Sequence, residues 1–135
     1  MKNMLALTIL QPWATLIVLG HKTLERRTYA PLHRGTIAIH ASSSRRGLEW
    51  AAHCKPLEDF TREIGLDVNA LPMGAILGEC QLYTITESKD NADLKANGWM
   101  MDGRYTWQLT GAIAYPSPVK AKGFVKLWPW DKPVA

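Results

Sequence analysis

The chain has 135 residues, a size that fits one domain, and it carries a formal net charge of +4. No apolar run approaches the roughly 20 residues that a membrane-spanning helix needs, and no signal-peptide pattern follows Met1. We therefore expect a single domain over residues 1–135, located in the cytoplasm and without membrane association. Cys54 and Cys80 lack a CxxC partner and lie in segments typical of a helix and a strand, which favours buried free thiols.

Positive charge is concentrated in the first third of the chain. Residues 1–50 hold seven Lys or Arg against two Glu, a net charge of +5, whereas the rest holds nine against ten, a net charge of −1. A basic segment of this kind favours an anionic partner. Two simpler interpretations remain open: the charges are only a solvated surface, or the domain binds an acidic protein.

The first half of the chain alternates strands and short helices. Residues 4–9 and 36–41 read as strands, and in the second of these Ile37 and Ile39 face the core while His40 points the other way. Residues 11–19 read as a helix with proline in its first turn and Gly20 at its end. Further helical segments are predicted over 45–53 and before Gly65.

The second half is rich in strands. They are predicted over 74–84, 105–109, 112–115 and 124–128, with a polar connection over 86–104. Several short strands with two or three inserted helices predict an α+β fold, built as a small β-barrel with flanking short helices.

The most charged short segment follows the first predicted helix. Gly20 suits a helix end, so the chain turns and sends residues 22–27 back as an extended strand. If this strand is partly buried, Glu25 needs a cationic partner, and Arg27 lies two residues on, on the same strand face. Lys22 is a candidate phosphate ligand or base, and Glu25 a candidate general acid or base. The simpler interpretation of Lys22 is a surface lysine.

A second candidate site follows the strand over 36–41. His40, Ser42 and Ser43 stand where the strand ends, and Arg45 and Arg46 begin the next helix. Hydroxyls and backbone N–H groups at a helix start form a phosphate cradle, although serines also cap helices without binding anything.

The sequence gives no support for a metal or a cofactor. The four histidines lack the spacing of a zinc site, and there is no GxGxxG or GxxxxGK[ST] pattern. Six tryptophans are many for this length. Aromatic faces beside arginines hold unstacked bases, but for each tryptophan alone packing is the favoured interpretation.

The chain resembles the ASCH (activating signal cointegrator homology) domain, a member of the PUA-like superfamily. Residues 7–14 resemble the family's LSIxQPWA start, and Gly20, Lys22, Glu25 and Arg27 fall on its GxKxxExR motif. His33-Arg34-Gly35, residues 74–78 and residues 107–128 resemble its later blocks, with Ala121-Lys122 in place of a more usual glycine run.

The resemblance implies a PUA-like barrel with a basic cleft facing RNA, another single-stranded nucleic acid or a modified nucleoside. Some relatives are amidohydrolases acting on N4-acetylcytidine, with a GxKxxT form of the motif; here Glu25 stands at the threonine position. Others are proposed ribonucleases using a Lys/Tyr/Ser set, for which Lys22, Tyr29 and Ser42 to Ser44 are the local candidates.

Two functions follow as expectations. The first is a binding module that needs no cofactor and contacts nucleic acid through Gln11, Trp13, Lys22, Glu25, Arg27, Tyr29, His40, Ser42, Ser43, Arg45 and Arg46. The alternative is a small hydrolase using the same cleft, with Lys22 and Glu25 as catalytic residues, attacking an acylated cytosine amide or an RNA phosphodiester.

Overall fold

The computed structural model describes residues 2–88 and 103–134. Six strands, three α-helices and one short 3-10 helix follow one another in these residues. Their bounds are β1 Lys2–Ile9, α1 Trp13–Val18, β2 Leu24–Arg27, β3 Gly35–Ala41, α2 Arg46–Ala51, α3 Lys55–Glu63, η1 Val68–Ala70, β4 Ala75–Glu87, β5 Tyr105–Lys120 and β6 Leu127–Lys132.

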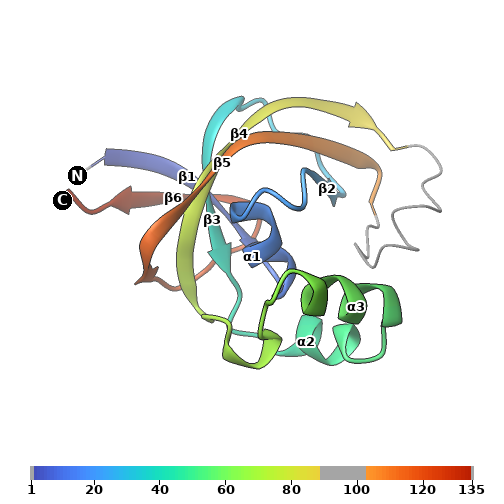
Figure 1. Ribbon diagram of the computed structural model, residues 1–135. Coiled ribbons are helices and arrows are strands. Elements are labelled where there is room, and N and C mark those ends of the chain that lie inside the picture. The colour runs from blue at the N-terminus through green and yellow to red at the C-terminus, as the bar shows by residue number, and fades with distance from the viewer. Residues whose placement is uncertain (1, 89–102, 135) are drawn as a thin grey trace.

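The strands form one mixed sheet in the order β2-β5-β4-β3-β1-β6. Only β1 and β3 pair in parallel, and every other neighbouring pair is antiparallel. The long strands β4 and β5 arch together over α1, while β1 and β6 run side by side to the two chain ends (Figure 1). The α+β class is confirmed. Within the described residues β2 and β6 end the sheet without pairing with each other, so the predicted barrel closure is not confirmed.

Hydrophobic residues cover both faces of the sheet. The larger core packs α1 against one face, where Leu7, Ile37 and Ile39 are fully buried. A smaller core on the other face gathers Ala38, Ile76, Trp128 and their neighbours. Because side chains alternate along a strand, His40 joins the second face, as expected from the sequence. On that face its ring meets Trp128 edge-on.

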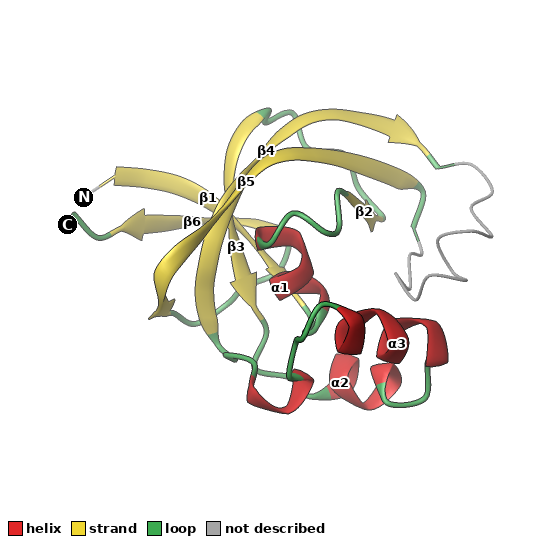
Figure 2. Cartoon of the chain, in the orientation of Figure 1, coloured by secondary structure: helices red, strands yellow, loops and turns green. Residues whose placement is uncertain are grey.

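Helices α2 and α3 lie together at one end of the sheet, next to α1 (Figure 2). Gly47 of α2 permits this close approach, because a Cβ there would stand 2.2 Å from the carbonyl oxygen of Gln11 and 2.9 Å from the ring of Trp13. No helix in the described ranges is long and apolar enough to cross a membrane.

Two predicted strands turn out to be one. Residues 105–109 and 112–115 both belong to β5, which continues to Lys120. Pro116 and Pro118 fit inside β5 because both lie between Ala114 and Val119, where the register with β4 shifts, and beyond the first four residues, to which the pairing with β2 is confined. The predicted strand 124–128 begins later, at Leu127, and continues to Lys132. Most of the predicted connection 86–104 lies outside the described residues.

Candidate functional site

The charged segment after α1 forms a compact ion network. Gly20 has a φ of 83°, and the backbone N–H groups of His21 and Lys22 both donate to the carbonyl of Leu16, which ends α1 and turns the chain toward β2. Glu25 accepts from Lys22 at 2.6 Å and from Arg27 at 3.0 Å. We call Lys22, Glu25 and Arg27 the β2 network. The predicted Glu25–Arg27 pair is confirmed, and Lys22 is a second partner.

Burial makes the β2 network a rigid arrangement of charge. Lys22 is only 2 % exposed and Glu25 only 8 %, so the expectation of a surface lysine is wrong. Burial alone would raise the pKa of Glu25, but the nearby Lys22 and Arg27 outweigh it and hold the pKa below its ordinary value. Glu25 is therefore a carboxylate at neutral pH, and the network carries two cations around one anion.

Arg27 connects this buried network to the surface. Its side chain keeps 26 % of its area exposed. Tyr29, two residues on, meets Trp107 edge-on at 5.3 Å, and Lys126 lies 5.5 Å from the centre of its ring. Burial raises the pKa of Tyr29, an effect that the Arg27 guanidinium partly offsets. The buried Tyr29 hydroxyl nevertheless has no well-formed hydrogen bond within residues 2–88 and 103–134.

A cavity of about 240 Å³ borders Lys22. Its walls come from the end of α1, the loop between α1 and β2, and the middle of β4 and β5: Ile17, Gly20, Lys22, Thr23, Cys80, Leu109, Thr110, Gly111 and Ala112. Burial and the nearby Glu79 carboxylate raise the pKa of Cys80 to about 12. This thiol is therefore protonated at neutral pH and is unsuited to be a nucleophile.

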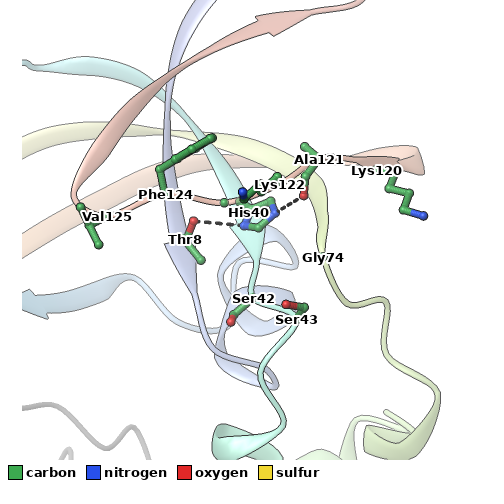
Figure 3. Close-up of a pocket in the computed structure, with 11 residues that line it drawn as sticks. Thr8, His40, Ser42, Ser43, Gly74, Lys120, Ala121, Lys122, Phe124 and Val125 are labelled. Atoms are coloured by element: carbon green, nitrogen blue, oxygen red, sulfur yellow. Dashed lines mark hydrogen bonds between the residues drawn. The ribbon is translucent and has the colours of Figure 1, made fainter.

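A larger cavity lies elsewhere, where the loop after β5 crosses the ends of β1 and β3 (Figure 3). It has a volume of about 750 Å³, and we call it the loop cavity. It is lined by Thr8, His40, Ser42, Ser43, Gly74, Lys120, Ala121, Lys122, Gly123, Phe124 and Val125.

His40 uses both of its ring nitrogens, one on the loop after β5 and one on Thr8 of β1. Its Nε2 lies 2.7 Å from the carbonyl of Ala121, which can only accept, so Nε2 carries the proton. Nδ1 then accepts from the hydroxyl of Thr8 at 3.1 Å, and that oxygen accepts from the indole N–H of Trp128 at 3.0 Å. Burial lowers the pKa of His40, so the ring is neutral at pH 7. Its polar atoms are occupied within the protein.

The other predicted contact residues are divided between the core and the surface. Gln11 is fully buried. Its amide oxygen accepts from the backbone N–H of Thr15, and its amide nitrogen donates to the carbonyl of Pro72. Trp13 is 4 % exposed and packs against Trp50. Arg45 and Arg46 are exposed at the start of α2, and neither lines the cavities described above.

The two candidate sites that the sequence predicts remain separate in the fold. The cavity that borders Lys22 and the loop cavity share no lining residue. Sequence reasoning missed Lys120, Lys122 and Phe124 as lining residues. The sequence signal is Lys120 and Lys122 on either side of Ala121, followed by Phe124, in a segment that resembles a closing strand pair. In the described part of the chain no three His, Cys, Asp or Glu side chains gather as a metal site would require.

Comparison with known proteins points to one family. The family model described as the ASCH domain matches residues 7–123. The crystal structure of an ASCH protein from Zymomonas mobilis is similar, with a TM-score of 0.50 and 15 % identity over 86 % of this chain and 72 % of that chain. A serine-to-alanine variant of that protein gives the same values. At this identity the likeness concerns the fold. No curated protein matches the sequence.

Proposed function

Since this chain belongs to the ASCH domain family, we propose that residues 1–135 act as one domain that binds single-stranded RNA or a modified nucleoside at the β2 network. The observation that supports this most directly is the arrangement of two cations around one buried carboxylate, with Arg27 reaching the surface. Arg27 is the phosphate or ribose contact, and Lys22 and Glu25 hold its guanidinium in place. Tyr29 supplies an aromatic wall beside it.

The geometry favours binding over general acid-base catalysis by these residues. A general acid must carry a proton, whereas Lys22 and Arg27 keep the pKa of Glu25 low. A lysine base must give up its proton, and this would cost Lys22 its ion pair at 2.6 Å. The alternative, a hydrolase with Lys22 and Glu25 as catalytic residues, is supported by the cavity of about 240 Å³ that borders Lys22.

Two adjacent arginines provide a matched test of binding. Arg27→Gln removes the surface cation of the β2 network, whereas Arg26→Gln removes an equal charge from the next residue, whose Nε donates to the hydroxyl of Thr106. With a labelled single-stranded oligoribonucleotide, we expect Arg27→Gln to weaken binding at least about tenfold, as for the loss of hydrogen bonds to a charged group. Arg26→Gln should change the affinity less than about twofold, because side chains alternate along β2 and Arg26 therefore leaves the strand on the face opposite to Glu25 and Arg27. Equal losses in both variants would contradict the proposal and indicate a diffuse charge effect.

The hydrolase alternative is tested on the unmodified protein. Incubation with N4-acetylcytidine and, separately, with end-labelled RNA should leave both intact if binding is the function. Cytidine or shortened RNA that forms in proportion to protein concentration would favour the hydrolase instead. Lys22→Arg keeps the charge but cannot act as a base, so its loss of turnover would assign the reaction to this site.

A further inference from the structure

We propose that the loop cavity is a second binding site, separate from the β2 network, for a phosphate ester carried on a flat aromatic ring, which is the chemistry of a nucleotide. This inference rests on the cavity alone and is independent of the function proposed for Lys22, Glu25 and Arg27.

The cavity has the size and the walls of a small-molecule site. Its volume of about 750 Å³ lies within the range of roughly 300–1,000 Å³ that is usual for ligand pockets. Its floor comes from Thr8 of β1 and His40 of β3, and one wall comes from the loop after β5. Segments far apart in the sequence therefore meet around one space.

The charge of the lining suits a phosphate. Lys120 and Lys122 are both exposed, and the lining contains no Asp or Glu. Ser42 and Ser43 add hydroxyls at the same cavity. The oxygen of Ser42 already accepts the N–H of Ser44 at 3.0 Å, so its proton is available to a ligand oxygen. Two lysines and two hydroxyls are suitable donors for a phosphate group.

The other end of the cavity suits an aromatic ring. Phe124 keeps 57 % of its surface exposed and meets Trp128 edge-on at 5.6 Å. Lys122 lies 5.8 Å from the centre of the Phe124 ring, so a cation and an apolar face stand side by side. In Figure 3, Phe124 and Val125 stand at one end of the cavity and Lys120 at the other. A ligand with a ring and a phosphate offers one suitable group to each end, whereas a simple anion would leave the apolar end empty.

The wall is held in place before any ligand arrives. The carbonyl of Ala121 accepts from His40, and the backbone N–H of Ala121 donates to the carbonyl of Gly74 at 3.1 Å. Gly123 lies directly on the His40 ring, where a Cβ would stand 2.6 Å from Cε1 and 2.7 Å from the hydroxyl of Thr8. Lys122 and Phe124 therefore extend from a fixed loop and Lys120 from the end of β5, which lowers the entropy cost of binding.

The test is a titration of the full chain by calorimetry with cytidine 5′-monophosphate, cytidine and inorganic phosphate. The variant K120Q/K122Q removes both cations of the cavity, and K55Q/R62Q removes two cations from exposed sites on α3 as a matched control. We expect the monophosphate to bind more tightly than either fragment. K120Q/K122Q should lose at least about tenfold in affinity, as for hydrogen bonds to charged groups, and the control less than about twofold.

Two further experiments identify the residue that contacts the ring and show whether the ligand is an RNA end or a free nucleotide. Phe124→Ala should weaken binding at least about fivefold through lost stacking, and the indole N–H resonance of Trp128 should shift on titration. A 5′-phosphorylated tetraribonucleotide that binds more tightly than the monophosphate would identify an RNA end, and equal affinities would identify a free nucleotide. The proposal is overturned if K120Q/K122Q binds the monophosphate like the wild type, or if cytidine or phosphate alone binds equally well.

Discussion

Glu25 is the residue on which the stability of the β2 network depends most. It is 8 % exposed and faces Lys22, which is 2 % exposed, so each of the two charges needs the other. Glu25→Gln leaves the buried ammonium without its counterion. We expect the free energy of unfolding to fall by about 3–5 kcal/mol, the usual cost of breaking a buried pair from one side. Urea denaturation followed by circular dichroism measures it.

The surface provides a control for this loss. Asp59→Asn breaks exposed contacts with Lys55 and Arg62, and such pairs contribute at most about 1 kcal/mol. The double variant Lys22→Met with Glu25→Gln removes both charges and should be more stable than Glu25→Gln alone. If Glu25→Gln unfolds at the same urea concentration as Asp59→Asn, the burial argument is wrong.

Protonation of His40 makes the stability of the protein depend on pH. Burial places its pKa in the folded state below the ordinary value of about 6.5, which applies to the unfolded chain. Between these two values the unfolded state binds more protons, so acid favours unfolding. Stability that is present above about pH 6.5 is therefore lost as the pH falls toward the folded-state pKa, by at most about 1.4 kcal/mol per pH unit from this one group.

Unfolding free energies at several pH values between 5 and 8 test this sign. His40→Gln removes the titrating ring and keeps an N–H for the carbonyl of Ala121, so the variant should show a flatter pH profile than the wild type. A profile of unchanged slope in the variant would mean that other groups cause the dependence.

At the scale of elements, Gly78 controls how closely β4 and β5 approach. A Cβ at this position would stand 2.2 Å from the carbonyl oxygen of Ile113. Gly78→Ala must therefore displace backbone, and we expect a loss of about 1–3 kcal/mol in unfolding free energy. Thr86→Ala, at an exposed position on the same strand, should stay within about 0.5 kcal/mol. Equal urea midpoints for the two variants would show that β4 and β5 accommodate the added methyl group without loss of stability.

The sequence predicted those elements whose burial alternates or follows a helical period. Ile37 and Ile39 located β3, and Gly20 located the end of α1. It failed for β5, because residues 105–109 and 112–115 read as two strands, whereas Gly111 between them has a positive φ of 60° inside one continuous strand. A local sequence pattern does not reveal that β4 pairs with β5 from Tyr105 to Lys120, across several register shifts.

Site prediction had the same limit. Glu25 and Arg27 are two residues apart on one strand, so their pairing followed from local geometry. Whether Gln11 faces a ligand or the carbonyl of Pro72 depends on a residue 61 positions away. The meeting of Ser42 with Lys122 likewise depends on how β3 and the loop after β5 are arranged in the sheet.

At the scale of the whole molecule, the net charge of +4 is spread over several regions. Lys22 and Arg27 share the charge of Glu25, Arg45 and Arg46 stand exposed at α2, and further lysines line the loop cavity. A diffuse field of this kind attracts any polyanion, and its contribution disappears with salt. Only contacts with bases or sugars remain when the phosphate contribution is screened.

Comparing RNA with a polyanion that lacks bases separates these two contributions. We expect the affinity for single-stranded RNA to fall by about 0.7 log units per log unit of salt for each phosphate contacted. Inorganic polyphosphate with the same number of charges should show a similar salt dependence but weaker binding throughout. Stacking of one base on Tyr29 or Phe124 contributes about 1–3 kcal/mol, which predicts about a 5- to 150-fold preference for RNA that persists when both lines are extrapolated to 1 M salt. Coincident lines would mean that the protein recognises charge alone, and neither proposed site would then bind a base.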